Sequence, residues 1–152
     1  TAVRAGLVIL EEEALKVSFV APVSNDYPEL NNYSAVIRIE YGETAFLLAG
    51  DAEAESEREM LSAGNPLTAT VLKVGHHGSS SSITPEFLQA VSPIYAVISV
   101  GAENDYGHPH RETLSKLAEK DIITYRTDLD GTIIFISDGE TLTVKTATDK
   151  IP

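Results

Sequence analysis

The chain of 152 residues contains no cysteine. This absence excludes disulfide bonds, thiolate zinc sites and cysteine nucleophiles together. It fits a cytoplasmic and an extracytoplasmic setting equally well, so it does not place the protein in a compartment. Any metal site in the chain would have to use histidine nitrogen and carboxylate oxygen atoms as ligands.

Positive charge is scarce as well. The chain has 11 lysine and arginine residues against 23 aspartate and glutamate residues, and its formal net charge is −12. Proteins that grip nucleic acid by its phosphates usually present basic stripes, so a surface of that class is not expected here. An acidic chain can still act on a phosphodiester where bound cations neutralise the site locally. The simplest interpretation of the acidity is solubility.

Long hydrophobic runs are also missing. No stretch approaches the roughly 20 apolar residues that a membrane-spanning helix needs, and the first residues lack the basic and then apolar pattern of a signal peptide. We therefore expect these 152 residues to be a soluble fragment. With 43% hydrophobic and 22% charged residues, residues 1–152 are expected to form a single domain with its own core.

The residues that are present alternate between β-rich and helical patterns, which predicts an α/β fold. The first half favours a hairpin meander of strands, and the second half favours the order strand, helix, strand, helix, strand. Thr84 followed by Pro85 is a typical helix start. The expected strands cover 6–10, 15–21, 34–41, 44–49, 70–74, 94–100, 122–125, 132–137 and 141–145, and the expected helices cover 52–63, 85–91 and 111–120.

All four histidines fall within two short runs, 75–79 and 107–110, and each run follows a predicted buried strand. Adjacent side chains of an extended segment point to opposite sides, so His76 and His77 can face one site only if the backbone turns. Gly75 and Gly78 make such a turn easy. A histidine pair in a turn is nevertheless more often structural than catalytic. In the second run His108 is a better ligand candidate than His110, which directly precedes a helix.

Two aspartate motifs have both a structural and a functional interpretation. Asp51 ends the apolar run 47–49 and precedes a helix, so alone it is more readily an N-cap than a ligand. Asp128 and Asp130 lie beside Gly131 but lack the later glutamate of a calcium loop, so a hairpin turn is expected there. The conjunction of Asp51, the 76/77 pair and His108 is more informative, because all follow strands. If those strands are parallel neighbours or belong to facing sheets, their ends supply ligands suited to zinc or manganese.

These motifs resemble the C-terminal metallo-β-lactamase-like domain of the ComEC family of DNA-internalisation competence proteins. The resemblance covers nearly the whole chain, and the order and spacing of its motifs make it specific. Its segments are 31–36 (Asn-Asn-Tyr-Ser-Ala-Val), 48–51 (Leu-Ala-Gly-Asp), 72–79 (Leu-Lys-Val-Gly-His-His-Gly-Ser), 99–110 (Ser-Val-Gly-Ala-Glu-Asn-Asp-Tyr-Gly-His-Pro-His) and 125–128 (Tyr-Arg-Thr-Asp) with Gly131.

The resemblance implies an αββα sandwich with a site for two divalent metal ions, zinc or manganese. It gives Asp51 the role of bridging the metals and His108 that of the last histidine ligand. One residue of the His76 and His77 pair would bind metal or contact the leaving group, and the sequence leaves open which does which. His77 is our choice for contacting substrate, and it is also included with Asp51 and His108 among the candidate metal ligands. We assign a catalytic role to both members of the pair. The site assignment is completed by two expected substrate contacts, Ser79 and Asn104.

Two departures from the superfamily pattern matter. The leading motif His-x-His-x-Asp-His, which supplies the remaining ligands, is absent, so we interpret the chain as the C-terminal half of the sandwich and a fragment of a larger protein. Asn31 and Asn32 stand where many hydrolases of this superfamily place a histidine, a feature that the ComEC pattern shares. We expect this fragment alone to bind metal weakly or not at all, and to lack robust nuclease activity. Its expected partners are the missing half, another copy of itself, and the membrane channel of the parent protein.

The implied function of the complete domain is metal-assisted hydrolysis of a DNA phosphodiester, with one strand of incoming DNA as substrate. The parent would be an integral membrane protein with this domain outside the cytoplasm. One alternative is hydrolysis of another ester, such as a phosphorylcholine or a lactone, on the same fold. Another is a non-catalytic interaction module in which the histidines only tie loops together.

Overall fold

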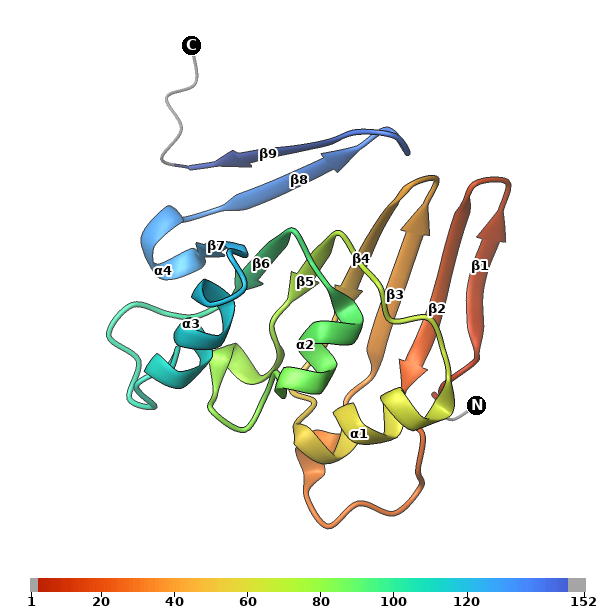
Figure 1. The fold of residues 1–152 in the computed structure, drawn as a ribbon, viewed down its shortest axis with the longest axis horizontal. Helices are drawn as coiled ribbons and strands as arrows, with labels where there is room; N and C mark the ends of the chain where they lie inside the picture. Colours follow the sequence, from red (N-terminus) through yellow and green to blue (C-terminus); the bar gives the residue numbers. More distant parts are fainter. Residues whose placement is uncertain (1–2, 148–152) are drawn as a thin grey trace.

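Seven strands form one mixed sheet in the order β1-β2-β3-β4-β5-β6-β7 (Figure 1). The computed structural model describes residues 3–147. The strands of the sheet are β1 (Val8–Glu12), β2 (Leu15–Ala21), β3 (Val36–Tyr41), β4 (Thr44–Leu48), β5 (Val71–Lys73), β6 (Tyr95–Ile98) and β7 (Ile123–Arg126).

The pairing changes halfway across the sheet. Strands β1 to β4 are antiparallel neighbours joined by short turns, whereas β4 to β7 pair in parallel. The carboxyl ends of β4, β5 and β6 therefore lie at one edge, which is where ligand sites of open α/β sheets are usually built. The predicted meander is confirmed, and of the two arrangements left open for the later strands the structure shows parallel neighbours.

Three helices, α1 (Ala54–Ala63), α2 (Pro85–Val91) and α3 (Arg111–Ala118), cover one face of the sheet (Figure 1). Alternate residues of the strands point toward them, as the two-residue period of a strand requires. Leu47, Leu72 and Ile98 are fully buried in one core cluster together with Phe87 and Leu117 of the helices. This cluster is the main core of the protein.

On the other face, a two-stranded hairpin, β8 (Ile133–Ser137) and β9 (Leu142–Thr146), packs over part of the sheet (Figure 1). Phe135 of the hairpin makes edge contacts with Phe46, Tyr95 and Tyr125, which lie on three different strands of the large sheet. These aromatic residues are only partly buried. The hairpin thus forms a second and thinner apolar layer.

The expected hairpin turn at Asp128 and Asp130 is wrong. The chain forms one helical turn there, α4 (Thr127–Asp130), and β7 and β8 belong to different sheets. The Asp130 carboxylate accepts a hydrogen bond from the Arg126 amide at 2.7 Å, and the Thr127 hydroxyl bonds to both backbone groups of Val100 at 2.8 Å. These contacts use the polar side chains to close a corner between the two sheets. The other predicted elements exist, with ends displaced by at most two residues.

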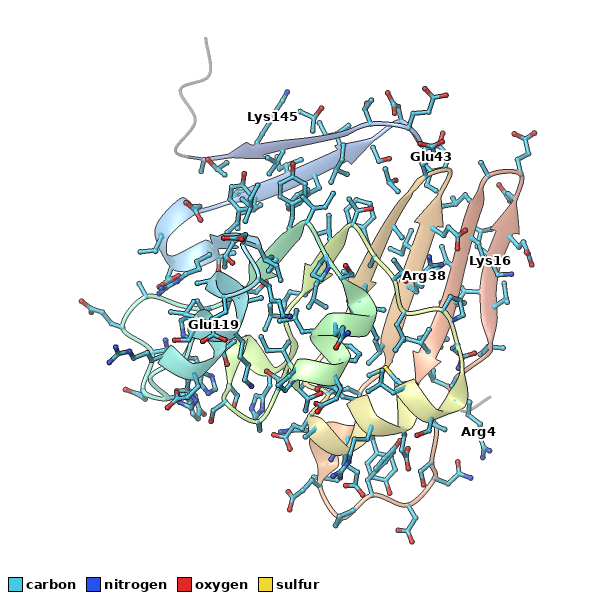
Figure 2. All side chains as sticks on the ribbon, in the orientation of Figure 1. Arg4, Lys16, Arg38, Glu43, Glu119 and Lys145 are labelled. Carbon is cyan, nitrogen blue, oxygen red and sulfur yellow. The ribbon has the colours of Figure 1, made fainter. Side chains whose placement is uncertain are left out.

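Lys16, Arg38 and Lys145 lie on three different strands, β2, β3 and β9 (Figure 2). Within residues 3–147, no helix has the length and apolarity needed to cross a membrane.

Candidate functional site

The loops that follow β4, β5 and β6 meet at a pocket of about 250 Å³. An adjoining pocket of about 190 Å³ shares His77, Tyr106 and His108 with it and extends over Val100, Gly101 and Asn104. The first pocket is lined by Asp51, His76, His77, Tyr106 and His108. The structure thus brings together the carboxylate and the three histidines singled out from the sequence.

Asp51 is held at the end of β4 by contacts of the backbone. Its amide donates to the Ser34 hydroxyl at 3.0 Å, and the preceding Gly50 has a φ of +56° and accepts a hydrogen bond from the His76 amide at 3.0 Å. The expectation that Asp51 alone favours an N-cap is wrong. Helix α1 has Glu53 at its N-cap position, and Asn32 caps the helix from a distance: its side-chain oxygen accepts from the amides of Glu53 and Ser56, both at 3.2 Å.

The histidine pair lies in a tight turn, η2 (Gly75–Gly78), in which both histidines adopt left-handed backbone conformations. Their φ angles are 47° for His76 and 54° for His77, a region that residues other than glycine rarely adopt. The turn brings both side chains to one pocket, which an extended segment could not do. Flanking glycines allow close packing, because a Cβ on Gly78 would lie 2.7 Å from the Pro109 side chain.

His77 presents an unprotonated ring nitrogen to Asp51 when it is neutral. Its Nδ1 lies 2.7 Å from the carbonyl oxygen of Ser99, and because a carbonyl only accepts, Nδ1 must carry the proton. Its Nε2 lies 3.7 Å from Oδ1 of Asp51. Two acceptors that face each other at this distance are favourable only with a proton or a cation to share.

His76 is anchored by a carboxylate. Its Nδ1 lies 3.0 Å from Oε1 of Glu53, which also accepts from the Ser81 hydroxyl at 2.9 Å and from the Asn31 amide group at 3.3 Å. Partial burial by itself would raise the pKa of Glu53, but the hydrogen bonds from Ser81, Asn31 and His76 outweigh it and lower the pKa below its ordinary value. Glu53 therefore stays ionised and acts only as an acceptor.

His108 approaches the pair from the loop after β6. Its ring contacts that of His76 edge-on at 5.5 Å and stacks with Tyr106 at 5.8 Å. Burial lowers the pKa of His108, and the neighbouring histidines His110, His76 and His77 lower it further. The neutral imidazole is the form that can accept a proton or ligate a metal.

The remaining residues of the motifs hold the loops in place. His110 accepts from the Ser80 amide at 2.9 Å with Nδ1 and donates to the Tyr106 carbonyl at 3.3 Å with Nε2, so both of its ring nitrogens are engaged. Asn104 ties its loop together by donating to the carbonyls of Gly101 and His108. Ser79 is 7% exposed and bonds to Ser81 at 2.9 Å. Contacts of Ser79 and Asn104 with a substrate stay predictions.

The expected metal ions can be tested against the donor set. Among residues 3–147, no three histidine, aspartate or glutamate side chains are grouped closely enough to hold a metal ion. Of the candidate ligands, Asp51 and His77 approach each other to 3.7 Å, between Oδ1 and Nε2. The side chains of residues 3–147 therefore do not by themselves group three such ligands.

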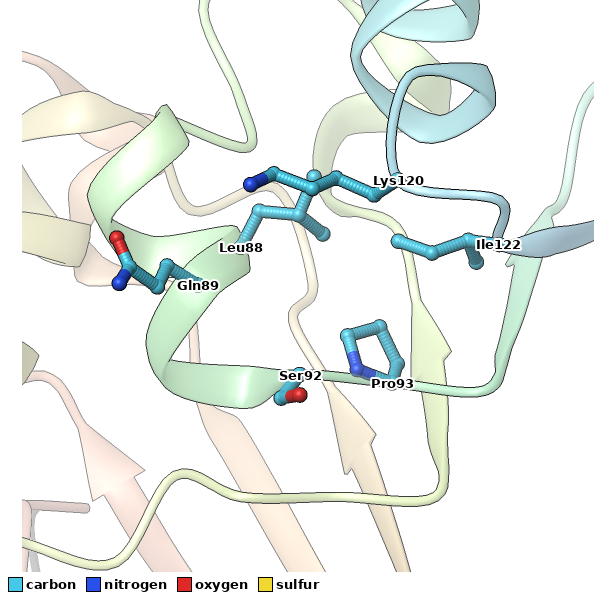
Figure 3. A pocket seen from close by; sticks show the side chains of 6 residues that line it. All are labelled: Leu88, Gln89, Ser92, Pro93, Lys120 and Ile122. Carbon is cyan, nitrogen blue, oxygen red and sulfur yellow. The ribbon is translucent and has the colours of Figure 1, made fainter.

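Another hollow of about 160 Å³ lies between the end of α2 and the segment after α3 (Figure 3). Its lining residues are Leu88, Gln89, Ser92, Pro93, Lys120 and Ile122. Lys120 is the only charged member of this lining, and no histidine or carboxylate accompanies it. The histidine pocket is therefore the better candidate for chemistry.

Two residues of the site were not predicted from the sequence. Glu53 stands only two residues after Asp51, and this proximity is the one local signal that could have pointed to it. Tyr106 lies in the 99–110 motif, but no role was predicted for it from the sequence. It is 79% exposed and lines the pocket. Both are placed by contacts with histidines that lie elsewhere along the chain or in the same loop.

The chain is similar in sequence to parts of several proteins whose names refer to competence or recombination. The chain is 40% identical over 125 residues to ComE operon protein 3 of Bacillus subtilis, which covers 82% of the chain and 16% of that protein. It is 36% identical to Competence protein ComA of Neisseria gonorrhoeae over 81% of the chain and 18% of that protein. It is 35% identical to Recombination protein 2 of Haemophilus influenzae over 68% of the chain and 13% of that protein.

The names of these relatives point to a competence family of the ComEC/Rec2 type. The chain spans between 13% and 18% of the length of each of these three relatives. No protein-family model matches the chain.

Proposed function

We propose that the histidine pocket is one side of a phosphodiesterase site that cleaves DNA during uptake, in a protein of the metallo-β-lactamase-like class. One observation carries the proposal. Asp51, His76, His77 and His108 reach a single pocket from the ends of three adjacent parallel strands. We propose DNA as the substrate, with a single strand as the species acted on; the names of the relatives, which refer to competence and recombination, are consistent with that class of substrate.

The two divalent metal ions expected for such a site, zinc or manganese, do not fit the side chains of residues 3–147 alone. We propose that an N-terminal half of the domain, in a longer protein with a membrane channel, supplies the missing ligands. The length of the relatives supports a longer protein. Leu10 and Tyr41, each 36% exposed on the antiparallel part of the sheet, offer apolar surface for that half to cover.

The side chains present can contribute acid–base chemistry at the pocket. The lowered pKa of His108 favours its neutral form, which is the form that can accept a proton. His77, once protonated on Nε2, would face Asp51 and could donate a hydrogen bond to a phosphate oxygen or a proton to the leaving oxygen. In this proposal His76 lines the pocket beside His108 and presents its Nε2 to the same space.

A second candidate is a non-catalytic interaction module. It is favoured by the lack of a three-ligand group among residues 3–147 and by the net charge of −12. In that case the histidines would only connect loops, as His110 does. The two candidates predict opposite results when pocket residues are replaced.

The test is cleavage of single-stranded DNA by the purified full-length protein in the presence of manganese or zinc. Asp51→Asn and His108→Ala are each expected to reduce kcat by about 100-fold or more, because each removes a group from the reacting pocket. Asp105→Asn is the matched control, since Asp105 is an exposed carboxylate of the neighbouring loop that does not line the pocket. Unchanged cleavage and DNA uptake in Asp51→Asn and His108→Ala would instead establish the interaction module.

A further inference from the structure

Glu53 gathers three hydrogen bonds on a single oxygen atom beside the pocket. Its Oε1 lies 3.0 Å from Nδ1 of His76, 2.9 Å from the Ser81 hydroxyl and 3.3 Å from the Asn31 amide nitrogen. The side chain is mostly buried, so these contacts are shielded from competing water. A rotation of the carboxylate would break all three contacts at once.

We propose that Glu53 is the positioning residue of His76: it holds the proton on Nδ1 and thereby presents the bare Nε2 to the pocket shared with Asp51, His77 and His108. The proposal deepens the proposed phosphodiesterase function and rests on it for its consequence in catalysis. The orientation itself is independent of what the pocket binds. In neutral histidine the hydrogen bond made by one ring nitrogen decides which nitrogen is protonated.

The backbone around His76 explains why an anchor is needed. The residue has a φ of 47° in a short turn, so no regular helix or strand sets the direction of its side chain. Among the described residues, no protein group hydrogen-bonds to Nε2, whereas Nδ1 has Glu53 at 3.0 Å and Ser81 at 3.5 Å. Within residues 3–147, Nδ1 is therefore the one ring nitrogen of His76 with a hydrogen-bond partner.

The neighbouring histidine has the same arrangement with a different partner. His77 donates from Nδ1 to the backbone carbonyl of Ser99 at 2.7 Å, so its Nε2 is also the bare nitrogen. The two rings thus present the same atom to one pocket. A backbone carbonyl cannot be removed by substitution, whereas Glu53 can, which makes His76 the half of the pair that can be tested.

A role in helix capping does not account for Glu53. It occupies the N-cap position of α1 but makes no side-chain capping bond. The amides that need a partner are bonded to Asn32 instead. Replacing the Glu53 side chain should therefore leave the start of the helix intact and change mainly the environment of His76.

The test is the tautomer of His76, read from long-range ¹H–¹⁵N NMR correlations of the chain at about pH 8.5, where an ordinary histidine is neutral. In the wild type we expect the proton on Nδ1. Glu53→Ala should move His76 toward the Nε2-protonated form. Glu53→Gln should keep the Nδ1 proton, because the amide oxygen can still accept. Glu55→Ala is the control, since it removes a carboxylate from the same helical turn without touching His76.

A wild-type His76 protonated on Nε2 would overturn the proposal, and so would an unchanged tautomer in a folded Glu53→Ala variant. If Glu53→Ala does not fold, a proton on Nε2 in the wild type or in Glu53→Gln still overturns the proposal. In the full-length protein, Glu53→Ala should reduce kcat by about 10 to 100-fold with little change in KM, and Glu53→Gln should restore most of it. Should the wild-type protein cleave no DNA while the tautomers behave as expected, the proposed function fails and the positioning role stands.

Discussion

The two faces of the seven-stranded sheet differ in how completely their side chains are buried. On the face covered by helices, Leu47, Leu72 and Ile98 are fully buried in one continuous core. On the other face, Phe46, Tyr95 and Tyr125 keep part of their surface exposed beneath the β8–β9 hairpin. The difference indicates that the helix-covered face supplies most of the stability, and that the pocket depends on this face because its loops leave strands anchored in that core.

A matched pair of phenylalanines tests this comparison with the largest expected effect. Phe87 is fully buried in the helix-covered core, whereas Phe135 is half-buried on the hairpin. Phe87→Ala should lower the free energy of unfolding by about 3–5 kcal/mol, because it removes buried apolar contacts and leaves a cavity. Phe135→Ala should cost about 1–2 kcal/mol. Urea denaturation measures both, and equal losses would show that the faces contribute alike.

The comparison also separates what could be predicted from the sequence. Hydrophobic periodicity located the strands and helices of the helix-covered core, because buried alternation is a local signal. It also placed Asp51 and the histidines after predicted strands. The hairpin turn expected at 127–132 was wrong. A local pattern of two aspartates and a glycine does not reveal that the Thr127 hydroxyl bonds to the backbone of Val100, in the loop after β6.

Within the site, the residues that escaped prediction are defined by distant partners. The capping of α1 by Asn32 joins positions 21 and 24 residues apart, and the contact of Glu53 with His76 joins positions 23 residues apart. No local pattern contains such pairings, so Asp51 was the natural candidate for the cap. The chemical residues were predictable from their types, whereas the residues that orient them required the fold.

Gly78 lies where the histidine turn packs against the helix-covered core. Gly78 has a φ of +82°, and a Cβ there would lie 2.7 Å from Pro109 and 3.3 Å from the Ile98 side chain. Gly78→Ala should therefore lower the free energy of unfolding by about 1–3 kcal/mol and displace the histidine turn. Gly101→Ala is the control: a Cβ there meets nothing within 4 Å, and the expected change is within about 0.5 kcal/mol.

Urea denaturation and the amide NMR shifts of residues 75–78 and 107–110 measure these effects. Equal stability of the Gly78→Ala and Gly101→Ala variants would show that the turn has room to relax. The tight packing of the core would then end before it reaches the histidines.

The smallest expected effect depends on pH and comes from a carboxylate inside the helix-covered core. Glu57 is 2% exposed, and its two oxygens accept from the amides of Ile83 and Thr84 at 2.6 and 2.7 Å. These bonds connect α1 to the start of α2. Burial raises the pKa of Glu57, and although the hydrogen bonds from Thr84 and Ile83 and the charge of Lys116 lower it, burial dominates.

The sign of the pH dependence follows from this raised pKa. Between the pKa of the unfolded chain and the higher pKa of the folded protein, the folded state binds more protons at this site, so stability falls as pH rises through that interval. In Glu57→Gln this contribution is absent. The stability of the wild type relative to Glu57→Gln should therefore be greatest at acidic pH and decline toward neutral pH, by less than the cost of Gly78→Ala. Urea denaturation of both proteins at matched pH values measures the difference, and a difference that grows with pH would show that the hydrogen bonds outweigh burial.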